Sequence, residues 1–181
     1  MSPSGRSSST PLSLAEGACL SLVVAGHRHG WALVRELASD GDIGRVWSLS
    51  RPLTYRSIDQ LASRGLLERG EIVPGKGTAR TLIAPTSAGR RAARRWVRTP
   101  VAHLRDVRTE LLVKLELASR LGIDRRELVV AQRAALEPIM SAIAARDPDD
   151  LVDLWRSVAS AAVGRFLDAA LALLDSLDAE R

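Results

Sequence analysis

Apolar residues recur every three or four positions over most of the chain, the spacing that places them on one side of an α-helix. The first such stretch covers residues 14–25. Ser13 and Glu16 have the spacing of a capping box at its start, and Gly26 suits its end. The same periodicity predicts two further helices, at residues 30–38 and 51–64. In the third helix we expect Leu53, Ile58, Leu61 and Ala62 to face the core.

The pattern changes after Gly65, which suits a helix end. Residues 66–73 and 80–84 are short runs compatible with β-strands, and a segment rich in glycine and proline separates them. These runs predict a hairpin with Lys76 at its tip. A fourth helix, capped by Thr86 or Ser87, then extends to Trp96. Three helices, a hairpin and a further helix follow each other in the order of a winged helix-turn-helix.

The rest of the chain is helical by pattern. Helices are predicted at residues 107–121, 124–145 and 149–177, with Gly122 ending the first of them and a kink expected at Pro138. The last helix carries an apolar stripe over about 40 Å of its length. A helical hairpin within the chain covers only part of such a stripe, so we expect a second subunit to cover the remainder. The predicted dimer interface consists of Leu151, Leu154, Val158, Phe166 and Leu173.

Composition and charge refine this picture. Aromatic residues make up only 3% of the chain, so the core is expected to consist mainly of aliphatic side chains in helices. Residues 1–100 contain 15 Lys and Arg against 7 Asp and Glu, whereas residues 101–181 contain 11 against 14. The net charge is therefore +8 in the first part and −3 in the second. The basic part is the one with the winged-helix pattern, which favours an anionic partner there.

Cys19 is the only cysteine and has no partner for an intramolecular disulfide. We read no export or membrane segment in the sequence and predict a cytoplasmic protein. Residues 1–11, rich in serine, proline and glycine, are expected to form a flexible tail. Residues 12–98 are predicted to form the winged helix-turn-helix domain, and residues 99–181 a helical dimerisation and effector domain. The predicted fold class is thus mainly α with a small β-hairpin wing.

The third helix and the hairpin carry the candidate DNA-binding residues. In a winged helix the third helix enters the major groove and the hairpin contacts the backbone or minor groove. Arg51 and Arg56 offer charged donors to phosphates or guanine edges, while neutral side chains near them offer hydrogen-bonding groups. On these grounds the predicted DNA-binding residues are Arg51, Thr54, Tyr55, Arg56, Lys76 and Arg80.

Several segments, taken in this order, resemble the PadR-like transcriptional regulators. They are Leu12-Ser13-Leu14-Ala15-Glu16, His29-Gly30-Trp31-Ala32-Leu33, Ser50 to Arg56, Leu61-Ala62-Ser63-Arg64-Gly65-Leu66-Leu67, Thr86-Ser87-Ala88-Gly89-Arg90, and Trp96. The resemblance implies a homodimeric repressor that binds an inverted-repeat operator in double-stranded DNA and is released by a small molecule or another signal. It also implies that Ser50, Tyr55 and Arg56 contact DNA from the third helix and that Lys76 and Arg80 do so from the wing.

Other chemistry receives less support from the sequence. No phosphate-binding loop, nucleophile elbow or acid–base pair stands out, so we predict no enzyme activity, no cofactor and no metal site. Four aromatic side chains are candidates for an effector pocket or for simple packing: Trp47, Trp96, Trp155 and Phe166. The alternative hypothesis is a winged-helix protein–protein interaction module without DNA binding, for which the arginines of the third helix and wing would be dispensable.

Overall fold

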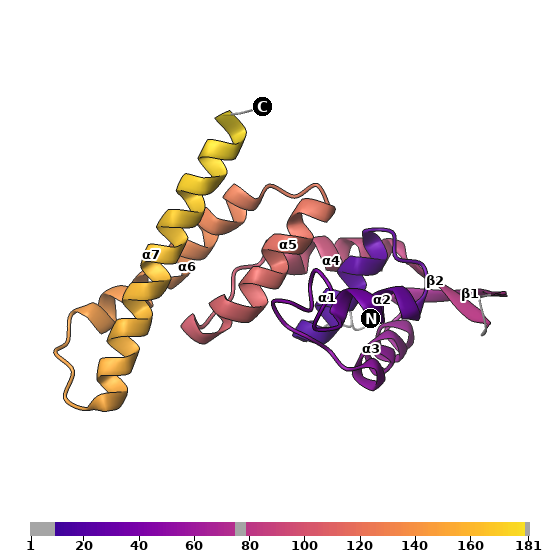
Figure 1. Ribbon diagram of the computed structural model, residues 1–181, viewed down its shortest axis with the longest axis horizontal. Helices are drawn as coiled ribbons and strands as arrows, with labels where there is room; N and C mark the ends of the chain where they lie inside the picture. The colour runs from indigo at the N-terminus through magenta and orange to yellow at the C-terminus, as the bar shows by residue number, and fades with distance from the viewer. Residues whose placement is uncertain (1–9, 75–78, 180–181) are drawn as a thin grey trace, which may run out of the picture.

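The computed structural model describes residues 10–74 and 79–179, and Figure 1 shows their arrangement. The predicted 1–11 tail lies almost wholly outside the described residues, as does Lys76. In chain order the elements are α1 (Leu14–Val24), α2 (Gly30–Leu37), α3 (Arg51–Ser63), β1 (Leu67–Val73), β2 (Arg80–Pro85), α4 (Ser87–Arg98), the 3₁₀ turn η1 (Leu104–Asp106), the π-helical turn η2 (Val107–Leu111), α5 (Leu112–Arg120), α6 (Arg125–Ala144) and α7 (Leu151–Ala179). The predicted fold class is confirmed.

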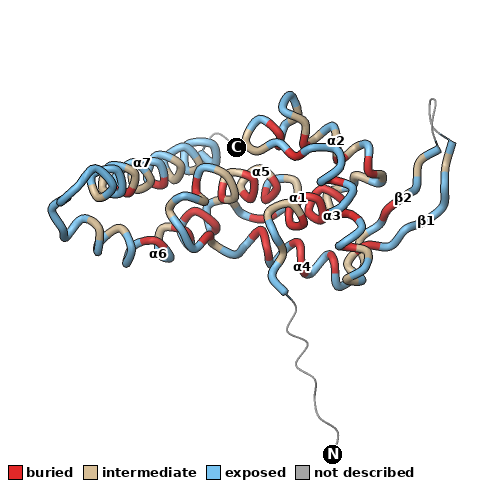
Figure 2. Tube along the Cα trace, turned by 90° about the horizontal axis from the view of Figure 1, so that it is seen from below, coloured by how far each residue is buried: buried red, intermediate tan, exposed pale blue. Residues whose placement is uncertain are grey.

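Helix α1 is the central element of the winged-helix half. It begins at the predicted capping box, in which the Glu16 amide donates to the Ser13 hydroxyl at 3.2 Å and the Ser13 amide donates to the Glu16 carboxylate at 2.9 Å. Every residue from 16 to 23 is buried, because α3, α4, β2 and α5 all pack against this helix. The long red segment labelled α1 in Figure 2 shows this burial.

Strands β1 and β2 form the predicted antiparallel hairpin. Their register runs from Leu67 opposite Pro85 to Val73 opposite Arg80, with an irregularity in β1 between Arg69 and Ile72. The segment before α2 adds a short third edge, since the Ile83 amide donates to the Arg28 carbonyl at 2.8 Å. The hairpin is therefore attached to the start of the helix-turn-helix and extends from it as a wing (Figure 1).

Helix α3 places two neighbouring residues differently from the prediction. Leu53, expected in the core, is 47% exposed, whereas Thr54, expected to be accessible, is fully buried. Thr54 tolerates burial because its hydroxyl donates to the Ser50 carbonyl at 3.0 Å, which satisfies it within the helix. Ile58 and Leu61 do face the core.

The C-terminal half starts less regularly than predicted. Instead of one helix over residues 107–121, the chain forms η1, then η2, and only then α5. Gly122, with φ of 60°, adopts the left-handed conformation at the joint between α5 and α6, as its predicted role as a helix stop requires. Pro138 lies within α6, which continues past it to Ala144.

Two apolar cores share the described part of the chain. The larger is built from α1 to α4 and the wing, and α5 also contributes to it through Val113 and Leu117. The smaller joins η2, α6 and α7 around Leu128, Leu136 and Leu167. Helix α5 thus belongs to the packing of the winged-helix half, although it follows residue 98 in the chain.

Helix α7 packs against α6 along one side only. Of its 29 residues, Ser160 and Leu167 are buried. Within the described residues it is also the one helix long and apolar enough to cross a membrane, judged by length and composition alone. It is nevertheless amphipathic, because one flank of the helix carries Asp168 and Asp175. These carboxylates pair with arginines of α6: Asp175 with Arg126 at 2.7 Å, and Asp168 with Arg133.

Candidate nucleic-acid interface

The outer face of α3 presents hydrogen-bonding and charged side chains to solvent. Ser50 precedes the helix, is exposed, and makes no side-chain cap hydrogen bond, so its hydroxyl is available. Arg51, Tyr55 and Arg56 are exposed on the helix itself. Four of the predicted DNA-binding residues are therefore accessible on one element.

Thr54 does not belong to this face. It is fully buried, and its hydroxyl is already engaged by the Ser50 carbonyl. We therefore remove Thr54 from the predicted DNA-binding set. Leu53, at 47% exposure, is among the outward side chains in its place, and an exposed aliphatic group can contact a thymine methyl.

Tyr55 is positioned by its neighbours. A Cβ on Gly30 would lie 2.6 Å from Cε1 of Tyr55, so the absence of a side chain at Gly30 lets the ring lie against the start of α2. The Arg51 guanidinium lies 5.8 Å from the centre of the Tyr55 ring, within cation–π range. The two helices of the helix-turn-helix thus hold the tyrosine and an arginine together at the surface.

The wing is tied to the same helix. Arg69 of β1 pairs with Asp59 of α3, and both side chains are more than half exposed. A hollow of about 190 Å³ lies between α2, α3 and the wing, and Tyr55 and Arg80 both line it. Arg80 begins β2 and is partly exposed, which places this predicted wing residue on the side of α3.

Three arginines of this surface have no acidic partner among the described residues. Within residues 10–74 and 79–179, Arg51, Arg56 and Arg80 form no ion pair. By contrast, Arg64 and Arg69 are paired with carboxylates. The unpaired arginines leave a local positive potential on the α3 face, which attracts polyanions.

The end of α3 is fixed by a charged contact that sequence reasoning did not identify. Arg64 donates to the Glu16 carboxylate at 2.7 Å. Burial alone would raise the pKa of Glu16, but hydrogen bonds from the Ser13 amide and Arg64 outweigh it and hold the pKa below its usual value. The ionised Glu16 therefore links the start of α1 to the end of α3.

Helix α5 is locked to the winged-helix half by a second set of charges. Arg120 pairs with Glu36 of α2 at 2.8 Å and with Asp42 at 3.0 Å. Arg45 pairs with Glu116 of α5 at 2.8 Å. Together with the shared core, these contacts make α5 move with the helix-turn-helix.

A buried lysine lies where α4 meets η2 and α5. The Lys114 ammonium donates to the Thr99 carbonyl at 2.7 Å, pairs with Glu110 at 2.7 Å and lies 4.9 Å from the centre of the Trp96 ring. Burial lowers the pKa of Lys114, and the Glu110 carboxylate opposes that shift. The Trp96 indole also packs against Gly17 of α1, where the absence of a side chain leaves room for the ring.

The four aromatic candidates for an effector pocket do not come together. Trp155 and Phe166 line one hollow of about 950 Å³ between η1, η2, α6 and α7, where Arg105, Arg108 and Arg156 also lie. Trp96 is buried beside Lys114, and Trp47 packs against the larger core. The prediction that all four line one effector pocket is therefore wrong for Trp47 and Trp96, which lie in the winged-helix half. Trp155 and Phe166 remain candidates.

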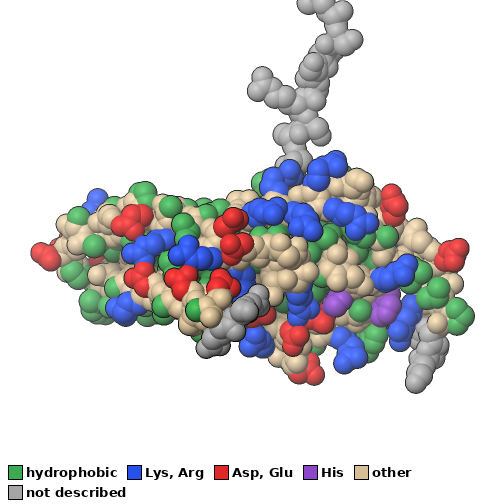
Figure 3. Space-filling view, turned by 90° about the horizontal axis from the view of Figure 1, so that it is seen from above, with side chains coloured by type: hydrophobic (Ala, Val, Ile, Leu, Met, Phe, Trp, Pro, Cys, Tyr) green, Lys and Arg blue, Asp and Glu red, His purple; other side chains and the backbone are tan. Residues whose placement is uncertain are grey.

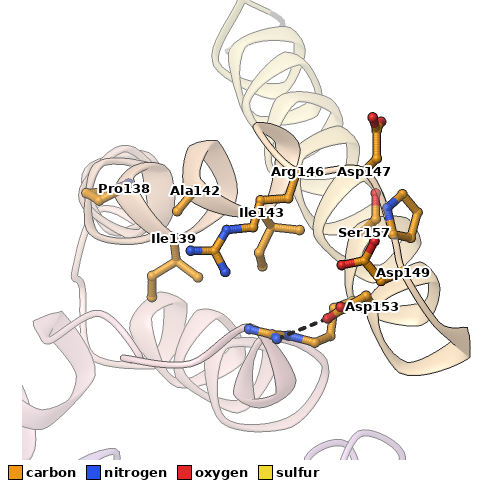
Figure 4. Close-up of a pocket in the computed structure, with 11 residues that line it drawn as sticks. Pro138, Ile139, Ala142, Ile143, Arg146, Asp147, Asp149, Asp153 and Ser157 are labelled. Atoms are coloured by element: carbon orange, nitrogen blue, oxygen red, sulfur yellow. Dashed lines mark hydrogen bonds and ion pairs between the residues drawn. The ribbon is translucent and has the colours of Figure 1, made fainter.

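Acidic side chains gather at the turn between α6 and α7, beside a third hollow of about 670 Å³ (Figure 4). Asp150 accepts from the Asp153 amide at 2.8 Å and so caps the first turn of α7, while Asp153 pairs with Arg156 at 3.4 Å. Over the described residues, no group of three or more His, Cys, Asp and Glu side chains is arranged to hold a metal ion. Asp150 and Asp153 thus make contacts within the first turn of α7 itself.

Histidine and cysteine side chains also have local structural roles. His29 caps α2, since its Nδ1 accepts from the Ala32 amide at 3.1 Å. Burial raises the pKa of the Cys19 thiol to about 12, so its thiolate form is scarce at neutral pH.

Comparisons with known proteins give a likeness in fold. No protein-family model matches the chain, and no curated protein matches it. Bacillus subtilis PadR in complex with operator DNA matches with a TM-score of 0.47 and 16% identity, over 95% of this chain and 100% of that one. The same protein in complex with p-coumaric acid matches with a TM-score of 0.41 and 16% identity, over 93% and 99%. At this identity, neither the DNA nor the acid is carried over to the present chain.

Proposed function

We propose that this protein is a sequence-specific, double-stranded-DNA-binding transcriptional regulator. The observation that carries the proposal is the exposed face of α3, where Arg51 and Arg56 lie beside Tyr55 and have no acidic partner in the described part of the chain. Helix α3 is long enough to lie in a major groove, and the wing lies alongside it. Base contacts are assigned to Arg56 and Tyr55, and backbone contacts to Ser50, Arg51, Lys76 and Arg80.

We further propose that the protein acts as a homodimer through residues 99–181, with residues 12–98 as the DNA-binding domain. The apolar residues of α7 that face away from α6 support this proposal: Leu151, Leu154, Val158, Phe166 and Leu173 are 36% to 83% exposed. A two-fold axis at α7 would present two copies of α3 to successive major grooves, about 34 Å apart, and so select an inverted repeat.

Repression and its release complete the proposal. A protein bound over an inverted repeat in the cytoplasm would block transcription, and a small molecule would release it by binding between α7 and η2. Trp155 and Phe166 provide apolar contact area in that hollow, and three arginines lie at its wall. The test is a thermal melt with a panel of small aromatic compounds. A ligand at this position raises the melting temperature of the wild type but not that of Trp155→Ala.

The DNA-binding proposal is tested by selecting fragments from a random DNA pool and measuring their affinity by fluorescence anisotropy. Arg56→Ala should weaken binding to the selected duplex by about 1–3 kcal/mol, or about 5- to 150-fold, and relax base preference at one position. Arg146→Ala, which removes an exposed arginine near the α6–α7 turn, is the matched control and should bind like the wild type. If no fragment is enriched even at low salt, the protein is better described as a protein–protein interaction module.

A further inference from the structure

Helix α4 presents a stripe of arginines that the α3 interface does not use. Its five arginines are all exposed: Arg90, Arg91, Arg94, Arg95 and Arg98. At 3.6 residues per turn they fall within an arc of about 140° around the helix. The buried residues of α4 occupy the opposite side: Gly89, Ala92, Ala93, Trp96 and Val97. We call the five arginines the α4 stripe.

The α4 stripe lacks carboxylate partners in the part of the chain that the structure describes, although Asp106 and Glu110 line a hollow together with Arg95. None of its members forms an ion pair there, and α4 itself contains no Asp or Glu. Within the described residues, the one side-chain hydrogen bond of the stripe runs from Arg94 to the Leu121 carbonyl at 3.0 Å. Arginines four positions apart repel each other on a helix, so an ordinary solvated face would alternate the two signs of charge. The missing counter-charges favour an anionic partner from outside.

The α4 stripe does not point in the direction of α3. Helix α1 packs against both α3 and α4, and in Figure 1 these two helices lie on different sides of it. The buried side of α4 faces the core around α1, so the arginines point away from it. Figure 3, which views the molecule from the side opposite α3, shows Lys and Arg side chains gathered along one edge of the winged-helix half. The α4 stripe and the α3 face are therefore separate surfaces of the winged-helix half.

We propose that the α4 stripe binds the phosphate backbone of a second DNA segment, independently of base sequence. Arg90 and Arg98 are about 12 Å apart along the helix axis, a length over which one DNA strand presents about three phosphates. A protein partner fits less well, because protein interfaces are centred on buried apolar or aromatic side chains. On α4 every exposed side chain besides the arginines is small, namely Ser87 and Ala88.

This inference adds to the proposed function a second contact of a different kind. The α3 face would read one site, while the α4 stripe would hold another stretch of the same or a neighbouring DNA molecule. Each protein molecule could then bridge two DNA segments without a second recognition site. The two contacts use different residues, so each is testable when the other is removed.

The first test measures binding to a labelled duplex of random sequence over a range of salt concentrations. The variant Arg90→Gln/Arg91→Gln/Arg98→Gln removes three charges and spares Arg94, whose guanidinium holds the Leu121 carbonyl. Two proteins are compared, one with the triple substitution and one with the stripe unchanged. Both also carry Arg51→Gln/Arg56→Gln, which removes the proposed DNA contacts of these two arginines on α3. With the stripe intact, binding should persist; with the triple variant, the slope of log affinity against log salt should fall by about 2.7 for three lost phosphate contacts.

Two controls keep this test specific. Arg125→Gln/Arg146→Gln/Arg165→Gln removes the same charge from one partly exposed and two exposed sites in the C-terminal half and should leave affinity and slope unchanged. Arg90→Lys/Arg91→Lys/Arg98→Lys retains the charge and should retain binding. If the glutamine triple binds like its charge-matched control, or if polyglutamate binds the stripe more tightly than the duplex does, the proposal is overturned.

The second test asks whether the two DNA contacts coexist. Protein saturated with an unlabelled selected duplex is titrated with the labelled random duplex. The wild type should bind the second duplex and the glutamine triple should not, while both bind the selected duplex equally. Failure to find a selected duplex would count against the proposed function and leave the first test of the α4 stripe intact. A wild-type complex that excludes the second duplex would overturn the bridging.

Discussion

Helices α1 and α7 both carry regular apolar patterns, yet the structure buries them to very different extents. Eight of the 11 residues of α1 are buried, against two of the 29 residues of α7. The apolar residues of α1 are covered by helices and a strand from the same chain. Those of α7 are covered by α6 on one side and are exposed on the other. The periodicity of a helix therefore shows that it has an apolar face, but not whether its own chain covers that face.

The largest expected effect comes from the core around α1. Leu20 is fully buried there, so Leu20→Ala should lower the free energy of unfolding by about 2–5 kcal/mol through lost burial and the cavity it leaves. Urea titrations at two protein concentrations should give the same loss. The control is Leu173→Ala on α7. Leu173 is 60% exposed in a single chain and would be covered only in the proposed dimer, so the effect of this substitution should depend on protein concentration. Equal, concentration-independent effects would remove the distinction between the helices.

The next effect concerns the uncovered face of α7. Val158 is 52% exposed, and Val158→Asp would place an unpaired charge in the proposed dimer interface. Burying a valine contributes about 1.5–3 kcal/mol, and the buried carboxylate adds a further penalty. Light scattering at micromolar concentration should show a dimer for the wild type and a monomer for the variant. Ser157→Asp, on the flank that also carries Asp168, should remain dimeric. A wild-type monomer would contradict the assignment, and binding of the wild type to lipid vesicles would point to a membrane surface instead.

A smaller effect tests how α1 is fixed to α3. Glu16→Gln should lower the free energy of unfolding by about 1–3 kcal/mol at neutral pH, because it replaces a carboxylate held by Ser13 and Arg64. The pKa of Glu16 is lowered in the folded protein, so this stabilisation is present above the unfolded-state pKa and is lost as pH falls through the folded-state pKa. Urea titrations of both proteins should therefore converge in acid. Glu68→Gln, at an exposed wing position, should match the wild type throughout.

The smallest expected effect concerns the cap at the start of α7. Asp150 caps the first turn of α7, so Asp150→Ala should cost about 0.5–2 kcal/mol in thermal or urea unfolding. Asp149→Ala removes a neighbouring exposed carboxylate and should have little effect. If Asp149→Ala costs as much, the acidic residues at this turn act through their summed charge and not through the cap.

Features fixed by neighbouring residues were predictable from the sequence. The capping box at Ser13, the helix stops at Gly65 and Gly122, and the hairpin between residues 66 and 84 all depend on local chemistry. The exposure of Leu53 and the burial of Thr54 were not predictable in this way, because a hydroxyl that bonds to the preceding turn can enter a core.

The arrangement of charged and aromatic side chains depends on contacts distant in sequence. Lys114 is buried because Thr99, Glu110 and Trp96 together satisfy its charge, and no local pattern indicates that. The separation of Trp96 from Trp155 likewise depends on how the two cores are joined. The arginines of α4 were visible in the sequence, but only the fold shows that they lie on one exposed side.

The attachment of α5 has a mechanical consequence. Arg120 fixes this helix to α2 and to the segment before α3, while Gly122 connects it to α6. The winged-helix half and α5 thus form one rigid unit, here called the arm, and the arm is joined to the α6–α7 hairpin (Figure 1). In a dimer built on α7, a slight change at the joint between α5 and α6, which η2 also bridges by packing with α6 and α7, would be amplified at the far end of each arm. The distance between the two copies of α3 would then be set by the angle of a joint remote from either DNA contact.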